Sequence, residues 1–297
     1  MRIGVDLGGS KIEIIALGDD GRVLLRERVA TPQGDYAATV RLVADLVAAA
    51  EGQAAARGTV GIGIPGAEAL GSGLIKNANS TCLIGKPLRR DLQALLQREV
   101  RIANDANCFA LSEAVDGAGE GANVVFGVIL GTGVGGGIVI DGKVLTGANA
   151  IAGEWGHNPM PGEQHQETCY CGRRGCVELY LSGPGLAADH RYSLGKPAGA
   201  ICPAELIAEH AAAGDAACEA TLQRYEARLA RALAQVINIL DPDVIVLGGG
   251  LSNIDRLYRN IPRLWGEHVF SDQVATKLFK HRHGDSSGVR GAAWLWP

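Results

Sequence analysis

The chain has 297 residues, 47% of them hydrophobic and 20% charged, and carries a formal net charge of −4. This composition is typical of a globular protein with one large or two medium domains. The slightly acidic balance, without a basic run, argues against a nucleic-acid or membrane-surface partner. No apolar run reaches the roughly 18–20 residues of a membrane span, and the N-terminus lacks the apolar segment of a secretory signal. We therefore expect a cytoplasmic protein.

The first third of the chain predicts a β-rich start that leads into a long helix. Residues 2–7 are typical of a buried strand, and a Gly-Gly-Ser-Lys turn connects them to a second strand at 12–17. The Asp-Asp-Gly sequence at 19–21 predicts a hairpin turn before a third strand at 22–29. The next predicted elements are a helix at about 36–56 and a strand at 60–64.

The remaining predicted elements are mostly helices. Asp241-Pro242 is expected to stop the longest helix, and Ser252 is expected to cap a helix after a glycine-rich turn. The predicted helices lie at 89–98, 104–115, 203–213, 215–240 and 286–296. The predicted strands of this part lie at 100–103 and 244–247.

Two stretches of the chain resemble each other at a distance of roughly 120 residues. The sequence IGVDLGG at 3–9 corresponds to FGVILGT at 126–132, and DGRVL at 20–24 corresponds to DGKVL at 141–145. Chance similarity between two glycine hairpins is the alternative. We interpret the repeat as a duplicated α/β domain, and clefts between such domains are favoured ligand sites.

Residues 153–178 place three cysteines in one stretch with His157 and the two carboxylates Glu154 and Glu178. Thiolate sulfur and imidazole nitrogen are the ligands that zinc prefers, and four protein ligands are typical of a structural site. Surface cysteines beside an unrelated histidine, or a disulfide, are the alternatives, although the two members of a Cys-x-Cys pair rarely meet disulfide geometry with each other. The candidate zinc ligands are His157, Cys169, Cys171 and Cys176.

Three glycine-rich turns follow apolar runs, at 8–9, 131–137 and 248–250. Backbone N–H groups in such turns can approach phosphates, so together they indicate a nucleotide, although each alone could be an ordinary tight turn. Asp6 precedes the first turn within an apolar strand, where a buried carboxylate needs a partner. We expect Mg²⁺ beside a triphosphate, with an ion pair to a lysine as the alternative.

Polar residues at two further places are candidates for chemistry. Asp105 lies between a predicted strand and a predicted helix, where it could accept the proton of an attacking hydroxyl group. A simple helix N-cap is the alternative for Asn104 and Asp105. Glu154, His157 and Glu178 form a set of polar groups suited to hydrogen bonds with sugar hydroxyls.

These motifs together resemble the ROK (repressor, open reading frame, kinase) family of sugar kinases, and the resemblance covers the whole chain. The wording NANST, EAVDG, LDPDVIVLGGG and SSGVRGAAWLW is similar to the bacterial fructokinase/mannokinase branch. The motifs that carry the resemblance are DLGGSK (6–11), GIPG (63–66), KNANST (76–81), NDAN (104–107), GTGVGGG (131–137), GEWGH (153–157), CYCGRRGC (169–176) with Glu178, LGGG (247–250) and GDSSGVRGAA (284–293).

The resemblance implies a duplicated actin-like ATPase (ribonuclease H-like) α/β fold, with two lobes around a central cleft and a zinc-binding loop at 153–178. It implies a smaller N-terminal lobe at 1–117, joined by the C-terminal helix 286–297, and a larger lobe at 118–285. The family is commonly dimeric, so a homodimer is expected. A DNA-binding segment has no room before the first strand.

The resemblance also implies residue roles, with ATP, Mg²⁺ and a structural Zn²⁺ as cofactors. Asp105 would be the general base. The residues expected to bind the sugar are Gly66, Asn79, Asn104, Asp105, Glu154, His157 and Glu178. The residues expected to bind ATP are Asp6, Gly8, Gly9, Ser10, Lys11, Gly131, Thr132, Gly133, Gly248, Gly249 and Gly250. The four candidate zinc ligands match the family's own.

We therefore expect an ATP-dependent hexose kinase that phosphorylates the 6-hydroxyl group of a free sugar, with fructose as the preferred sugar. A glucokinase, mannokinase or N-acetylhexosamine kinase of the same family is the alternative. A non-catalytic sugar-sensing member is a further alternative. The presence of Asp105 and of the two carboxylates Glu154 and Glu178 argues against it.

Overall fold

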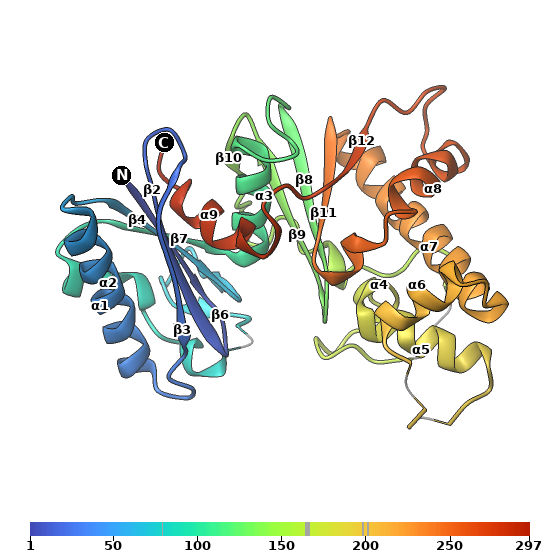
Figure 1. Cartoon of the computed structure of the whole chain (residues 1–297), viewed down its shortest axis with the longest axis horizontal. Coiled ribbons are helices and arrows are strands. Elements are labelled where there is room, and N and C mark those ends of the chain that lie inside the picture. Colours follow the sequence, from blue (N-terminus) through green and yellow to red (C-terminus); the bar gives the residue numbers. More distant parts are fainter. Residues whose placement is uncertain (79, 164–166, 198, 201) are drawn as a thin grey trace. The chain divides into compact units, whose positions relative to one another are not determined.

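The structure, a computed structural model, describes residues 1–78, 80–163, 167–197, 199–200 and 202–297 (Figure 1). The chain forms two compact units. The first contains Met1–Gly121, Gly137–Ala152 and Arg282–Pro297, and the second contains Ala122–Gly136 and Gly153–His281. The predicted lobe boundaries, by comparison, leave 137–152 in the larger lobe, and they stay a prediction. Among the described residues, no helix is long and apolar enough to cross a membrane.

The first unit is built on a five-stranded sheet in the order β3-β2-β1-β4-β7. The β1–β2–β3 meander is antiparallel, whereas β4 and β7 run parallel to β1. The strands are β1 (Arg2–Leu7), β2 (Lys11–Leu17), β3 (Val23–Ala30), β4 (Thr59–Ile64) and β7 (Val100–Asn104). Each lies within one or two residues of its predicted position, because apolar runs bounded by glycine turns mark strands clearly.

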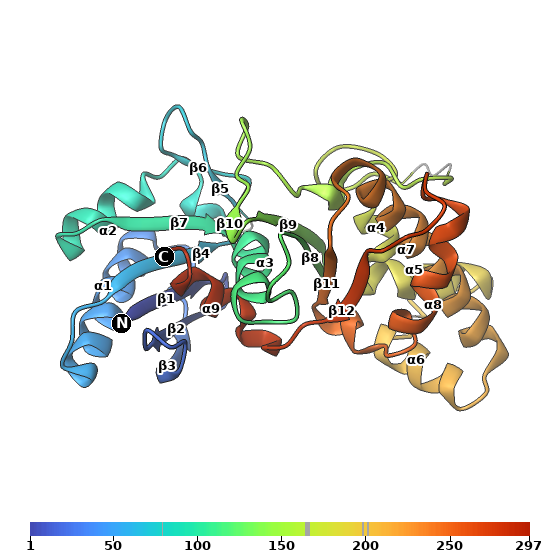
Figure 2. The same ribbon diagram turned by 90° about the horizontal axis from the view of Figure 1, so that it is seen from above.

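Helices cover both faces of this first sheet (Figure 2). One face packs against α1 (Tyr36–Ala54) and α2 (Leu88–Leu96), which share a buried apolar core with β1 and β4. The other face packs against α9 (Ser287–Ala293), which in turn contacts α3 (Asp105–Val115). A short hairpin, β5 (Ala67–Glu68) and β6 (Ile75–Lys76), follows β4.

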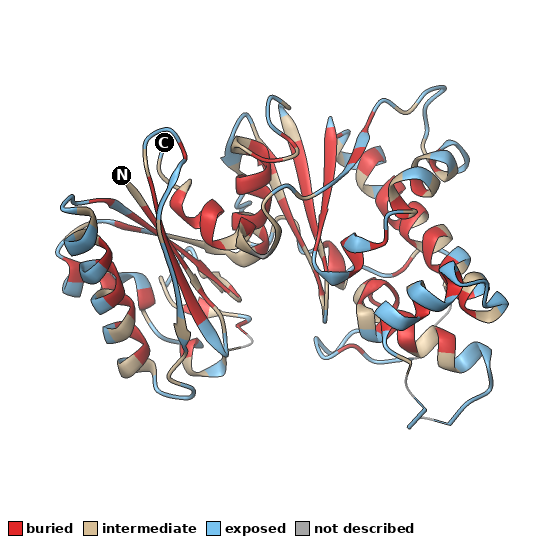
Figure 3. Cartoon of the chain, in the orientation of Figure 1, coloured by how far each residue is buried: buried red, intermediate tan, exposed pale blue. Residues whose placement is uncertain are grey.

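The helix α9 lies with its backbone in direct contact with the sheet and with α3. A Cβ atom at Gly61 would lie 1.9 Å from the carbonyl oxygen of Ala292, and one at Gly291 would lie 1.7 Å from the carbonyl oxygen of Cys108. Both distances are impossible for real atoms, so glycine is required at both positions. The residues on both sides of this contact are mostly buried (Figure 3).

A second five-stranded sheet has the equivalent order, β10-β9-β8-β11-β12. Its strands are β8 (Val124–Leu130), β9 (Val134–Ile140), β10 (Lys143–Val144), β11 (Val244–Gly248) and β12 (Lys277–Lys280). Ile3 pairs with Val60 in the first sheet, and Phe126 pairs with Ile245 in the second. The predicted duplication is therefore confirmed, down to the register of the parallel strands.

The second unit also carries most of the later helices. Asp215 caps the longest of them by accepting hydrogen bonds from the N–H groups of Ala217 and Cys218, and Asp241 ends it in the left-handed conformation before Pro242. The helices of this unit are α4 (Glu178–Leu181), α5 (Gly183–Ser193), α6 (Ala204–Ala212), α7 (Ala216–Leu240) and α8 (Leu257–Leu264). The sequence prediction had missed α4, α5 and β12.

Two predicted helix ends are wrong. Ser252 lies inside a 3₁₀ turn and donates to the carbonyl of Gly249, so it caps no α-helix. The last helix ends at Ala293 rather than at Trp296. The reason is tertiary: the Trp296 indole leaves the helix to donate to the carbonyl of Val60 at 2.7 Å, and the Arg101 guanidinium lies 3.9 Å over its ring.

Candidate functional site

Asp105 is the first residue of α3, directly after β7. The helix is capped by Asn104, whose Oδ1 accepts from the N–H of Ala106 at 2.9 Å and whose Nδ2 donates to the carbonyl of Gly66 at 3.2 Å. Asn104 therefore caps the helix, and Oδ1 of Asp105 also accepts from the N–H of Ala106, at 2.8 Å. This arrangement leaves the Asp105 carboxylate at a helix N-terminus, where the helix dipole favours its ionised form.

Asp6 lies close to Asp105 within the first unit. Burial, together with the charges of Asp105 and Glu13, raises the pKa of Asp6 to about 7. Within the described part of the chain, the Asp6 carboxylate has no hydrogen-bond or ion-pair partner within contact distance. The structure therefore offers a buried, unpaired carboxylate that fits a Mg²⁺ ion, which prefers one or two carboxylates together with phosphate oxygens.

The first glycine turn connects β1 to β2 beside Asp6. Its backbone is fixed by a hydrogen bond from Gly8 N to the Lys11 carbonyl at 3.0 Å. Thr31 holds the same turn from β3's end, since its hydroxyl donates to the Gly8 carbonyl and its N–H donates to the Ser10 carbonyl. A rigid turn of this kind can present N–H groups to a phosphate.

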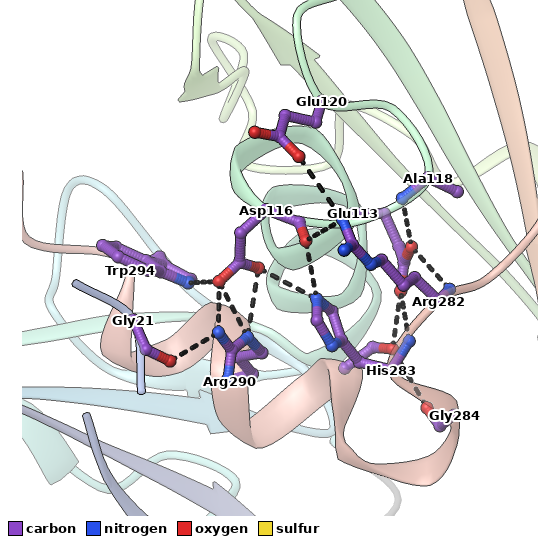
Figure 4. Close-up of polar contacts among 11 residues, drawn as sticks. Gly21, Glu113, Asp116, Ala118, Glu120, Arg282, His283, Gly284, Arg290 and Trp294 are labelled. Atoms are coloured by element: carbon purple, nitrogen blue, oxygen red, sulfur yellow. Dashed lines mark hydrogen bonds and ion pairs between the residues drawn. The ribbon is translucent and has the colours of Figure 1, made fainter. Parts of the chain in front are cut away.

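The C-terminal end of α3 is held by a buried carboxylate, that of Glu113 (Figure 4). Its Oε2 accepts from the backbone N–H groups of Ala118 and Arg282, both at 2.9 Å. Its Oε1 accepts from the hydroxyl of Ser287 at 2.8 Å and from the N–H of His283 at 3.4 Å. Glu113 thus ties α3 to the segment that leads into α9.

Asp116 forms a second contact between the same two segments (Figure 4). Its carboxylate accepts from the Arg290 guanidinium, from the indole of Trp294 at 3.1 Å and from the ring of His283 at 3.0 Å. Burial alone would raise its pKa, but the hydrogen bonds from His283 and Arg290 outweigh burial and hold the pKa of Asp116 at about 2. The helix that carries Asp105 is therefore fixed at both ends.

The four predicted zinc ligands, His157, Cys169, Cys171 and Cys176, come together in the second unit. Their candidate ligand atoms all lie within 4.8 Å of one another. Nδ1 of His157 lies 3.6 Å from Sγ of Cys169, and Sγ of Cys171 lies 3.6 Å from Sγ of Cys176. A tetrahedral zinc with Zn–S bonds of about 2.3 Å has ligand–ligand distances of about 3.7 Å, so the donor set fits zinc.

The loop reaches this arrangement because its two sides pair. Met160 N donates to the Gly175 carbonyl at 2.8 Å, and Val177 N donates to the Asn158 carbonyl at 2.9 Å, which brings the histidine side beside the cysteine side. Trp155 anchors the turn before His157, because its buried ring packs edge-on against Phe126 of β8 at 5.9 Å.

Glu178 connects the zinc loop to the second glycine turn. Its Oε2 accepts from the N–H of Val134 at 3.0 Å, and its Oε1 lies 3.7 Å from Sγ of Cys169. A Cβ atom at Gly133 would lie 2.6 Å from the same Oε2 atom, so the carboxylate rests directly on the glycine turn. Glu178 thus contacts both the second glycine turn and the candidate zinc ligand Cys169.

Tyr170 was not predicted as a site residue, yet it contacts one. Its hydroxyl lies 3.0 Å from Nε2 of His157, and the two rings meet at 82°. Partial desolvation of the hydroxyl, together with the charges of Glu178, Cys169 and Glu154, raises the pKa of Tyr170 to about 12. The phenol therefore lies among the predicted sugar-binding side chains of the second unit.

A cavity of about 630 Å³ lies in the second unit beside the second glycine turn. Gly131, Thr132 and Gly250, all predicted to bind ATP, line it. Residues of α5 and of the start of α6 complete its wall. They were not predicted to line a nucleotide site, because their residue types are not typical of one. The further lining residues are Gly183, Pro184, Ala187, Ala188, Arg191, Pro203, Ala204, Glu205 and Leu251.

The predicted site residues fall into two groups, one in each unit. The first unit holds Asp6, the turn 8–11, Gly66, Asn104 and Asp105. The second unit holds the loop 153–178 with the zinc cluster, and most of the other two glycine turns. Asn79 lies outside the described residues. Gly249 does not line the cavity; it has a φ of +78° and packs against the backbone of Leu130.

Comparison with known proteins places the chain among sugar kinases. The ROK family model matches residues 2–297. The N-acetyl-D-glucosamine kinases of Vibrio cholerae and Photobacterium profundum are 44% and 43% identical to the chain, and each alignment covers 99% of both proteins. The crystal structure of a ROK hexokinase from Thermus thermophilus has a TM-score of 0.87 at 30% identity, over 99% of this chain and 97% of that one.

These relatives overturn the expectation that fructose is the preferred sugar. Proteins that align over their full length at 40–44% identity carry the name N-acetyl-D-glucosamine kinase. Two of the motifs that resemble fructokinases lie in framework segments. EAVDG contains Glu113 and Asp116, and SSGVRGAAWLW forms α9 and the tryptophan-containing segment that follows it. The contacts of these segments are within the fold, between α3 and the segment that carries α9.

Proposed function

This chain belongs to the ROK family and is a sugar kinase, and we propose that it is an ATP-dependent N-acetyl-D-glucosamine kinase that phosphorylates the 6-hydroxyl group of the free sugar. The observation that carries the choice of sugar is the full-length identity of 43–44% to proteins with that name. The candidate site supports the reaction class, because phosphoryl transfer needs one positioned base, charge neutralisation and backbone cradles for phosphates.

Asp105 is the proposed general base. Its position at the N-terminus of α3 favours the charged carboxylate, and Asn104 fixes the backbone beneath it by capping the helix. The carboxylate accepts the proton of the 6-hydroxyl group as the hydroxyl oxygen attacks the γ-phosphorus, and the bond from that phosphorus to the β–γ bridging oxygen breaks, so that ADP leaves. Glu113 and Asp116 hold the far end of the same helix, so Asp105 does not need to be positioned by the substrate.

Asp6 and the turn at 8–11 are the proposed first-unit contacts to the metal–nucleotide complex. Mg²⁺, when bound, neutralises charge on the transferring phosphoryl group. The raised pKa of Asp6 follows from burial next to Asp105, and a cation beside it would favour the ionised carboxylate. The N–H groups of the turn can donate to phosphate oxygens.

The cavity of about 630 Å³ is the proposed site of the adenosine part of ATP. Its volume is in the range of small-molecule sites, and Gly131 and Gly250 add no side-chain bulk to its lining. The proposed sugar ligands of this unit are Glu154, His157 and Glu178. A structural zinc on the four-residue cluster would brace the loop that carries His157.

A cytoplasmic homodimer is proposed from the family resemblance alone. Light scattering coupled to size-exclusion chromatography measures the mass in solution, and a mass of about one chain would contradict the dimer.

A coupled ADP-release assay across a panel of sugars tests the proposed function. With ATP and Mg²⁺, we expect the kcat/KM for N-acetyl-D-glucosamine to exceed the values for glucose, mannose and fructose by about tenfold or more, because a pocket built to hydrogen-bond an acetamido group rejects sugars without it. N-acetyl-D-mannosamine should also react less well, because its acetamido group has the opposite configuration at C2. A higher kcat/KM for any other sugar contradicts the proposed substrate. If no sugar gives ADP release, the proposed kinase activity is contradicted.

A further inference from the structure

Tyr170 lies between two candidate zinc ligands, Cys169 and Cys171, and its side chain is 74% exposed. An aromatic side chain this exposed usually has no contact that fixes its conformation. Here, however, the hydroxyl lies 3.0 Å from Nε2 of His157, and the two rings meet edge to face at a centroid distance of 5.2 Å. The phenol is therefore fixed on the imidazole by two contacts.

The other ring nitrogen of His157 faces the cysteines. Nδ1 lies 3.6 Å from Sγ of Cys169, in the direction that the candidate zinc would occupy. An imidazole that gives Nδ1 to a metal carries its proton on Nε2 and donates it to a neighbouring acceptor. With Nδ1 on zinc, the acceptor would be the oxygen of Tyr170, 3.0 Å away, so Nε2 would have a partner before any sugar arrives.

A phenol oxygen and a sugar hydroxyl oxygen accept the same hydrogen bond. The Tyr170 side chain also lies near the carboxylates of Glu154 and Glu178, the other two proposed sugar ligands of this unit. The hydroxyl is thus placed where a hydroxyl group of the sugar would be expected. Since the side chain is exposed, it can leave this place at low cost by rotating into solvent.

We propose that Tyr170 is a further substrate-site residue, whose hydroxyl holds the Nε2 hydrogen bond of His157 that a sugar hydroxyl takes over on binding. The inference rests on the proposed function, because it needs His157 to bind a sugar. The sugar replaces an internal hydrogen bond, and Tyr170 therefore lowers sugar affinity while it keeps the imidazole oriented in the free enzyme.

The substitution Tyr170→Phe tests this, because it removes only the competing oxygen and keeps the ring that packs on His157. Isothermal titration calorimetry with N-acetyl-D-glucosamine should give a Kd about two- to tenfold lower than that of the wild type, the value of one hydrogen bond. The Kd for ATP and the zinc content per chain should not change.

Tyr192→Phe is the matched control. Tyr192 is also an exposed tyrosine of the second unit, and its hydroxyl donates to Glu167 at 2.8 Å rather than to a proposed sugar ligand. This variant should bind the sugar as the wild type does, which separates the loss of one particular hydrogen bond from the loss of any exposed phenol.

An unchanged or higher Kd for the sugar in Tyr170→Phe would overturn the proposal. Loss of zinc from that variant would also overturn it, because the hydroxyl would then serve to hold the ligand His157. If the wild type binds a different hexose from the panel, the proposed substrate fails, and the comparison of Tyr170→Phe with the wild type is made with that hexose. A wild type that binds no hexose overturns both proposals.

Discussion

The buried carboxylate of Glu113 accepts a hydrogen bond from the hydroxyl of Ser287 at 2.8 Å, which joins the C-terminal end of α3 to the first residue of α9. Three backbone N–H groups donate to the same carboxylate. A side chain that satisfies four donors from segments far apart in the sequence acts as a fixed point of the first unit.

The substitution Glu113→Gln should therefore destabilise the protein. The amide keeps one acceptor oxygen but turns an NH₂ group towards backbone donors, which leaves buried N–H groups unpaired. We expect a loss of about 2–3 kcal/mol in the free energy of unfolding, measured by urea denaturation. Glu120→Gln is the control, since Glu120 is 63% exposed and should change the value by less than about 0.5 kcal/mol. Equal effects of both variants would refute the role of Glu113.

Asp6→Asn should abolish activity and yet stabilise the ligand-free protein at alkaline pH. The pKa of Asp6 is raised from 3.8 to about 7 in the folded state. Between these values the folded protein retains a proton that the unfolded chain releases, so the free energy of unfolding falls as pH rises. A shift of three pKa units corresponds to at most about 4 kcal/mol at pH 8.

Urea denaturation at pH 4.5 and pH 8 measures this difference. The wild type should lose more stability than Asp6→Asn between the two pH values. Asp45→Asn, at an exposed position of α1, should follow the wild type. Parallel pH dependence in the wild type and in Asp6→Asn is the outcome that would contradict the raised pKa of Asp6.

Gly291→Ala should destabilise the protein strongly, because the new methyl group would lie 1.7 Å from the carbonyl oxygen of Cys108. The two helices must separate to admit it, and we expect a loss of about 3 kcal/mol or more in thermal or chemical denaturation. Gly52→Ala is the control, since nothing lies within 4 Å of a Cβ atom there. Because Gly52 lies within α1, this variant should gain up to about 1 kcal/mol. Similar stability of the two variants would contradict the close helix contact.

Cys171→Ser should remove the structural metal. Serine replaces a thiolate ligand in a cluster whose ligand atoms lie within 4.8 Å of one another. We expect the zinc content, measured by elemental analysis, to fall from about one ion per chain towards zero, and kcat/KM to fall with it. Cys82→Ser lies outside the cluster and should retain zinc. Full zinc and activity in Cys171→Ser would contradict the zinc site.

The sequence predicted the two sheets well because their signals are local. Apolar runs that end in glycine turns define β1, β4, β8 and β11, and the repeat of the first strand at Phe126 predicts the second sheet. The four zinc ligands were predicted for a related reason, since cysteine and histidine at short spacing have few other uses. Here the chemistry of the residue types alone was informative.

The features that sequence analysis missed depend on contacts between distant segments. The end of α9 is set by the hydrogen bond from Trp296 to Val60, 236 residues away. Glu113 looked like an ordinary helix residue, and its four partners are known only once the chain is folded. Tyr170 gave no signal, because a tyrosine inside a Cys-x-Cys motif has no typical role. The choice of sugar was wrong, and two of the motifs used for it, EAVDG and SSGVRGAAWLW, lie in framework segments and contain none of the proposed sugar ligands.

Asp105→Asn tests the central claim most directly, in an assay of ADP release with saturating ATP, Mg²⁺ and N-acetyl-D-glucosamine. Asparagine keeps the shape of the side chain at the start of α3 but cannot accept the hydroxyl proton. The account predicts that kcat falls by about 10²–10⁴-fold while the Kd for the sugar, measured by calorimetry, stays within a factor of about three. A variant with kcat near that of the wild type would contradict the role of Asp105 as general base.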